Sequence, residues 1–505
     1  RGDIVNVVSD NFVGSGMSFL VTLKEGKNFH SFIYNYEKEL LSFPVATAAP
    51  FLVADPETLK QLVVICDGKD TRFYQIDKDS SDEPTIVEKE DFRLDVILHP
   101  EHTSSIIDLT GDLKPNLVLS TIEKGKRFLR IYDFYSEKPK LVQTMPLPDQ
   151  MGPALFLNNN KSQTFDLIYV CVEDGKSHIK IHENLNTVDK SKLSNEIKAL
   201  KYFQGVESGK VFEQKATREI SIRSIFDTEA VLKDKNGMPT GLFLADVEGT
   251  DNTDILITLK DGSGAYVQSV ILKDDEFIQP KYNKHMKEHK DVLSVSVFGF
   301  NLYDNQDLLI NHIENGTPVL KVLNTKSLSN KARLKVITLH SHLKGDRPKK
   351  GDLNLHIVFG ATYFVSQTDH NGKTFYFKVA QSTHTSYPSM QSLRIYITLE
   401  EEKRPLEYII VHTNYYYIES VSKIKPYFYR RDITPTILLV FSIFEKEWHM
   451  KEIVSINYSY TVILFFCALF LFNLFLLIFC TFSAMQYERA RKGEYAYFYP
   501  VLTTI

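Results

Sequence analysis

Short apolar runs recur along the first two thirds of the chain, and each is followed by a turn and by a segment in which apolar and polar residues alternate. Six segments share this pattern, beginning at Phe19, Leu62, Leu117, Leu167, Ile255 and Leu308. An almost wholly apolar strand beside an alternating one is typical of a buried strand paired with a half-exposed one. The pattern therefore predicts a series of β-hairpins.

A glycine marks the turn of each predicted hairpin: Gly26, Gly68, Gly125, Gly175, Gly262 and Gly316. Glu, Asp or Asn precedes the glycine in five hairpins, and Lys124 does so in the other. Such pairs favour tight connections between strands, because glycine accepts the positive φ that these turns require.

The spacing of the hairpins indicates how they are organised. Their starting residues are 43, 55, 50, 88 and 53 positions apart, which is a repeat of about 50 residues with one double gap. A degenerate copy within residues 200–240 would fill that gap and make seven. Sheet units of this length are typical of β-propellers. We therefore expect an all-β fold, with a seven-bladed β-propeller over residues 1–343 and a solenoid as the alternative architecture.

The pattern changes after a polar, basic segment at residues 343–354, which is typical of a linker. Alternating strands continue without the repeat, and Asn371-Gly372 favours another hairpin. This predicts a separate β-sandwich over residues 353–447.

Residues 460–484 contain no charged side chain, and 25 such residues are enough to cross a bilayer. Arg489, Arg491 and Lys492 follow, which places the tail at residues 485–505 in the cytoplasm. This topology requires a leader, so we interpret the chain beginning at Arg1 as processed after signal-peptide removal. Asn473 lies near the middle of the apolar run, either bonding a partner helix or standing as a tolerated polar residue.

Charge and composition limit the classes of function that we expect for the chain. The net charge of −4 is small and spread along the chain, which argues against a nucleic-acid-binding surface, so we expect no nucleic-acid partner. Asn160 and Asn315 lie in glycosylation sequons, as expected of a luminal or extracellular region. Cys66 and Cys171 are either buried thiols or one disulfide. No catalytic constellation is present, since residues 205–210 lack the Ser or Thr of a phosphate-binding loop, and we expect no enzyme activity.

Two loops have oxygen-bearing side chains at the alternating spacing of a calcium loop. They comprise Asp108, Thr110, Asp112 and Asn116, and Asp246, Glu248, Thr250 and Asp254. Calcium is the only cofactor that the sequence suggests. The alternative is that these side chains bond backbone amides and tighten turns without metal.

The segments "DLTGDLKPNLVLS" and "ADVEGTDNTDILIT" resemble the FG-GAP motif of integrin α chains. The order of propeller, sandwich, single helix and short tail is similar to that of the T-cell immunomodulatory protein family. The resemblance implies calcium in some blades, cell-surface adhesion or signalling, and cytoplasmic partners such as AAA+ ATPases and tubulin.

Two functions fit these features. One is a non-enzymatic, single-pass type I membrane protein of the cell surface or an endomembrane, whose propeller binds other membrane or extracellular proteins. The other is an accessory subunit of a transporter, channel or membrane enzyme, with the propeller as a luminal or extracellular cap and the Asn473 helix packed on a partner.

Overall fold

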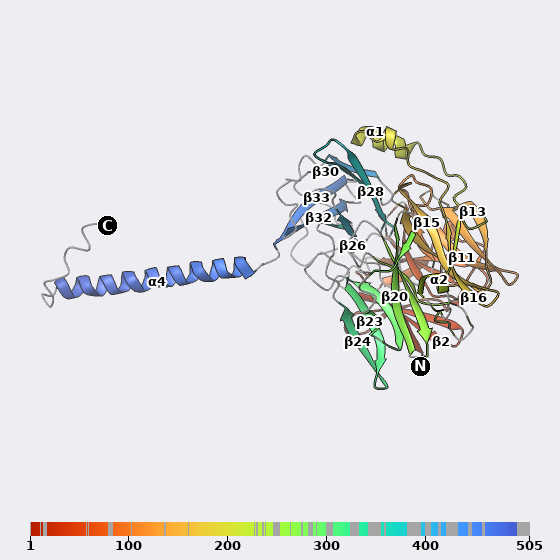
Figure 1. The fold of residues 1–505 in the computed structure, drawn as a ribbon, viewed down its shortest axis with the longest axis horizontal. Helices are drawn as coiled ribbons and strands as arrows, with labels where there is room; N and C mark the ends of the chain where they lie inside the picture. Colours follow the sequence, from red (N-terminus) through yellow and green to blue (C-terminus); the bar gives the residue numbers. More distant parts are fainter. Residues whose placement is uncertain are drawn as a thin grey trace. The chain divides into compact units, whose positions relative to one another are not determined.

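Antiparallel β-sheets make up most of the part of the chain that this computed structural model describes (Figure 1). The described residues are 2–10, 12, 13, 18–56, 58, 60–78, 84–100, 102, 104–135, 138–159, 161–226, 228, 231–234, 237, 239–245, 253–262, 264–273, 276–280, 286–288, 290–298, 307–323, 333–341, 355–357, 360–380, 395–398, 406–412, 416–420, 433–442, 447–456 and 460–491.

All six predicted hairpins are present. They are β2 (Ser18–Glu25) with β3 (Asn28–Tyr34), β6 (Gln61–Cys66) with β7 (Thr71–Lys78), β11 (Asn116–Glu123) with β12 (Lys126–Asp133), β15 (Thr164–Glu173) with β16 (Lys176–His182), β19 (Asp254–Asp261) with β20 (Gly264–Lys273), and β23 (Asp307–Glu314) with β24 (Thr317–Leu323). Lys124 and Gly125 have φ of 50° and 77°, as two-residue turns between twisted strands require.

Flanking strands extend each hairpin into a sheet, and we number these the first to sixth sheets in chain order. In the same order, separated by semicolons, the added strands are β1 (Asp3–Asp10) and β4 (Glu39–Ser42); β5 (Phe51–Ala54) and β8 (Pro84–Glu88); β9 (Ile97–Leu98), β10 (Ser105–Ile107) and β13 (Lys140–Leu147); β14 (Leu155–Asn159) and β17 (Arg218–Ser221); β18 (Leu242–Ala245) and β21 (Glu276–Ile278); and β22 (Val292–Phe298). Within the described residues the sixth sheet has three strands.

Consecutive sheets pack on one another through shared apolar clusters. In β11, Leu117 and Leu119 join a cluster with the first and second sheets, whereas Val118 joins a cluster with the fourth sheet. Further clusters join the fourth sheet to the fifth and the fifth to the sixth. The middle strands are buried on both faces, which explains why their sequences are apolar rather than alternating.

The long gap between the fourth and fifth hairpins has a different cause from the predicted one. Residues 183–217 are an insertion that contains η2 (Lys190–Lys192) and α1 (Glu196–Gln204), and β17 and α2 (Ile222–Phe226) follow. Because β17 pairs with β16, it completes the fourth sheet. Elsewhere in the described part of residues 200–240, an isolated bridge joins Lys233 to Pro239 but no further sheet forms, so the prediction of a degenerate copy there is wrong. Helix α1 instead packs against later strands, β30 and β31.

Two further sheets follow. The β25 sheet contains β25 (Arg333–Ser341), β26 (Leu355–Ile357), β29 (Ile395–Thr398), β32 (Ile433–Ser442) and β33 (Glu447–Ile456). The β27 sheet contains β27 (Thr362–Thr368), β28 (Thr374–Ala380), β30 (Leu406–His412) and β31 (Tyr416–Ser420). Strand β25 belongs to the predicted first domain but pairs in parallel with β32 of the predicted second domain. Residues 1–455 form one compact unit.

Helix α4 (Tyr460–Arg491) begins at the first residue of the predicted apolar run and belongs to the second unit, residues 456–505. Its residues 465–489 are long and apolar enough to span a membrane, and they are not buried by the rest of the chain. Arg489 and Arg491 lie in its last turn. These features indicate a single-pass membrane protein.

Candidate functional site

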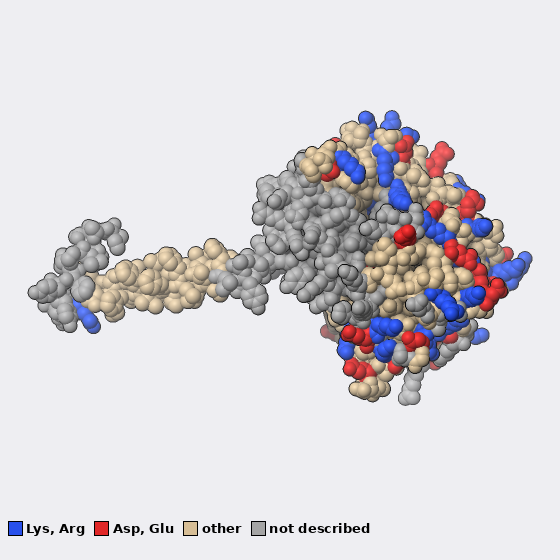
Figure 2. Space-filling model, in the orientation of Figure 1, with Lys and Arg blue, Asp and Glu red and all other residues tan. Residues whose placement is uncertain are grey.

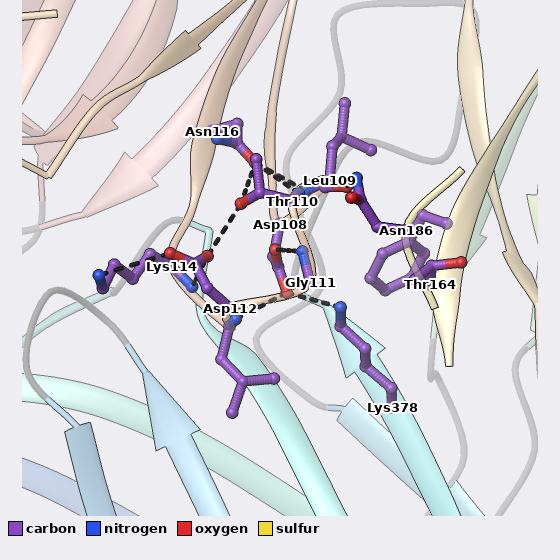
Figure 3. Close-up of polar contacts among 12 residues, drawn as sticks. Asp108, Leu109, Thr110, Gly111, Asp112, Lys114, Asn116, Thr164, Asn186 and Lys378 are labelled. Carbon is purple, nitrogen blue, oxygen red and sulfur yellow. Dashed lines mark hydrogen bonds and ion pairs between the residues drawn. The ribbon is translucent and has the colours of Figure 1, made fainter. Parts of the chain in front are cut away.

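The first predicted calcium loop connects β10 to β11 in the third sheet. Its four predicted ligands, Asp108, Thr110, Asp112 and Asn116, lie close together and are at most 1% exposed (Figure 3). The loop turns sharply because Gly111 and Leu113 both have positive φ, of 84° and 66°. The sequence therefore located a real cluster of oxygen-bearing side chains.

Two of these side chains bond the loop's own backbone. Asp108 accepts hydrogen bonds from the amides of Gly111, at 2.8 Å, and Leu113, at 2.9 Å. Asn116 Oδ1 accepts from the amides of Leu109, at 2.7 Å, and Thr110, at 3.2 Å. These bonds satisfy amides that the tight turn removes from the β-ladder.

Asp112 has a second set of contacts. Its Oδ1 accepts from Thr110 Oγ1 at 2.9 Å and from the Lys114 amide at 3.0 Å. The Lys114 ammonium lies 3.4 Å from Oδ2 and 4.4 Å from the centre of the Tyr135 ring. Burial, and then the negative charge of Asp108, raise the pKa of Asp112 to about 7.

Lys378 of β28 is the residue that the sequence reasoning missed. Its ammonium lies 2.5 Å from Asp108 Oδ2, and both side chains are fully buried. The ammonium also lies 5.2 Å from the centre of the Phe165 ring (Figure 3 shows the ion pair). The available signal was a lysine two residues from Tyr376 and Ala380, on the same face of an otherwise apolar strand.

The β27 sheet covers this loop. Asn158 donates to the Lys378 carbonyl at 2.7 Å, and Gln163 donates to the Tyr376 carbonyl at 2.8 Å. A Cβ added to Gly360 would lie 2.9 Å from Ile106, so the backbone approaches the third sheet closely there. The loop is thus part of an internal contact between sheets.

The side chains as placed do not fit a calcium ion, which takes six to eight oxygen ligands. The oxygens of Asp108 and Asn116 already accept backbone amides, and an ammonium group lies on Asp108. Calcium at this loop stays a prediction, and the structure brings a lysine to the position where a cation was expected.

The second predicted loop lies mostly outside the described residues, which exclude Asp246, Glu248 and Thr250. Asp254 is the first residue of β19 and is fully buried. Among the described residues, no group of three or more His, Cys, Asp or Glu side chains could hold a metal ion.

The remaining predicted residues have simple environments. Asn315 lies exposed at the turn between β23 and β24 with φ of 52°, and Asn160 lies outside the described residues. Cys66 and Cys171 are buried free thiols, so the disulfide alternative is wrong.

Asn473 is exposed on α4, and its Nδ2 donates to the Leu469 carbonyl of the same helix at 2.8 Å.

A buried pair of histidines was not predicted. The rings of His99 and His102 lie 4.0 Å apart, and Arg127 contacts His102 Nε2 at 3.2 Å and donates to the Met151 carbonyl at 2.9 Å. Burial, followed by the nearby Arg127 charge, lowers the pKa of His99 to about 3. The pair is thus neutral at ordinary pH and serves as part of the packing between strands.

No protein-family model and no curated protein matches the chain. Among solved structures, a functionally unknown protein from Desulfotomaculum acetoxidans is 11% identical, with a TM-score of 0.28, over 72% of this chain and 95% of that one. The WD40 domain of Toxoplasma gondii coronin is 9% identical, with a TM-score of 0.27, over 60% of this chain and 77% of that one. Both scores are low, so the description of the fold rests on strand order and burial.

Proposed function

We propose that the chain is a non-enzymatic, single-pass type I membrane protein whose sheet array binds other proteins. The six sheets are blades of a seven-bladed FG-GAP-type β-propeller, and later strands supply the seventh blade and a β-sandwich. One observation carries this proposal. Consecutive antiparallel sheets of three to five described strands follow one another in sequence order and pack through shared cores, and an exposed apolar helix follows them.

The proposed binding surface is made of loops on a rigid scaffold. The inner strands are fixed by burial, while hairpin turns such as those at Gly125 and Gly175 are exposed. On the face in Figure 2, acidic and basic side chains are interspersed over the described surface. Such a surface suits recognition of proteins of mixed charge better than binding of a polyanion.

The alternative is an accessory subunit of a larger membrane complex, and α4 is the observation that favours it. Its described side chains between residues 465 and 489 lie on the surface, with Asn473 near the middle. An amide within a bilayer can bond a second helix, and such bonds contribute about 0.6–2 kcal/mol.

The test is purification of the native chain in a mild detergent, followed by mass spectrometry of the intact assembly. A receptor is expected as a monodisperse species without a stoichiometric polytopic partner. One such partner, lost in Asn473→Leu and kept in the control Cys467→Leu, would instead support the subunit function. Release from membranes by alkaline carbonate without detergent would contradict both.

A further inference from the structure

We propose that Lys378 takes the place of a metal ion in the 108–116 loop and fastens the β27 sheet to the third sheet without calcium. In this arrangement the cation that Asp108 requires is built into the chain. The inference concerns the assembly of the ectodomain and does not depend on what the ectodomain binds.

Asp108 requires a cation close to its carboxylate. A fully buried carboxylate is strongly unfavourable unless it is hydrogen-bonded and paired with a positive charge. Two loop amides bond Asp108, and the Lys378 ammonium at 2.5 Å supplies the charge. In a calcium loop the metal ion would supply it.

The loop's own two carboxylates, Asp108 and Asp112, each have a lysine of their own, Lys378 at 2.5 Å and Lys114 at 3.4 Å. The neighbouring Asp133 carboxylate accepts hydrogen bonds from Asn116 Nδ2 at 2.9 Å and from the Tyr135 hydroxyl at 3.3 Å. A divalent ion in the loop would add two positive charges beside carboxylates that already face ammonium groups. The loop is therefore complete without metal.

The strand that carries Lys378 is fixed in place. The side chains of Asn158 and Gln163 hold carbonyl groups of β28, and Ala380 of the same strand joins the apolar cluster of the third and fourth sheets. These contacts hold the backbone from which the Lys378 ammonium reaches Asp108. Since Lys378 and Asp108 lie 270 positions apart in the chain, their pairing ties the ends of a long segment together.

The experiment measures the melting temperature of the full chain in detergent, with calcium or with a chelator. Asp246→Asn is introduced throughout, to remove the other predicted loop from the comparison. The melting temperature is expected to agree within about 1 °C between the two conditions. A rise with calcium that disappears on adding Asp108→Asn would overturn the proposal, and this arm requires no variant of Lys378.

A second arm tests the lysine itself. Lys378→Met is expected to lower the melting temperature by several degrees, because it leaves a buried carboxylate unpaired. Lys373→Met in the adjacent exposed turn is the control, with a change of about 1 °C or less. Adding Asp108→Asn to Lys378→Met should recover part of the loss, since it removes the unpaired charge. Equal effects of Lys378→Met and Lys373→Met would refute the clamp.

Discussion

At the scale of single residues, the 108–116 loop shows that one side-chain spacing serves two purposes. Oxygen atoms at alternating positions can surround a metal ion or capture backbone amides, since both require acceptors that converge inside a tight turn. Here the acceptors of Asp108 and Asn116 bond amides. The deciding residue, Lys378, comes from a strand far along the chain. Its local pattern marks it as a lysine on an apolar strand face but does not show that its partner is Asp108.

Asp112→Asn tests the electrostatics of the loop. The pKa of Asp112 is raised to about 7, above its unfolded value of about 4, so the folded state binds a proton more readily. Ionisation of Asp112 therefore costs stability as the pH rises from about 4 to about 7. An asparagine side chain at this position would keep the acceptor oxygen and lose this dependence.

The free energy of unfolding of the variant, relative to that of the native chain, is expected to increase as the pH rises from 5 to 8. The increase is up to roughly 3 kcal/mol, since each pKa unit corresponds to about 1.4 kcal/mol. Denaturant unfolding of both full-length chains at pH 5 and at pH 8 measures this difference in the free energy of unfolding. The groups facing Asp112 are Asp108, Lys114 and Tyr135. An equal difference between variant and native chain at the two pH values would show that Asp112 does not titrate in this range.

At the scale of elements, the hairpins follow directly from local sequence. Each needs an apolar strand, a turn that accepts positive φ and an alternating strand, and all three lie within about twenty residues. Their prediction was correct in all six cases. The predicted copy within residues 200–240 failed because a long insertion mimics a missing repeat when only spacing is considered.

Lys124→Asn tests the turn between β11 and β12. Lys124 has φ of 50°, a conformation that costs most residues roughly 1–2 kcal/mol and that asparagine tolerates well. The substitution is expected to stabilise the chain by about 0.5–1 kcal/mol in denaturant unfolding. Lys126→Asn, at the exposed start of β12, is the control and should be neutral or slightly destabilising. A larger gain at Lys126 would show that charge, and not backbone conformation, is the cause.

At the scale of the whole molecule, topology links the sheets to the helix. The basic residues Arg489 and Arg491 follow the apolar span, so the preceding sheets are expected on the luminal or extracellular side. The side of the membrane on which the sheets lie also decides whether Asn315 can be glycosylated, because the modification occurs only on the luminal or extracellular side. Its exposed place at a hairpin tip leaves room for a glycan.

Thr317→Ala tests this topology while leaving Asn315 in its turn. Expressed in a eukaryotic secretory system, the native chain should lose mass on enzymatic deglycosylation, and the variant should lose one glycan fewer. Thr317→Ser keeps the sequon and is the matched control. If the native chain and Thr317→Ala carry the same number of glycans, then Asn315 is not modified, and this support for a luminal β24 is withdrawn.

Features that depend on short-range interactions could be read from the amino-acid sequence alone. Apolar runs beside alternating ones predicted the strands, and a polar residue followed by glycine predicted each turn. An uncharged run predicted α4. Features that depend on residues distant in the chain required the three-dimensional structure. It paired β25 with β32 across the predicted linker, and it brought Lys378 to Asp108. The physical reason is that burial and charge pairing depend on neighbours in space, whereas a sequence pattern records only neighbours along the chain.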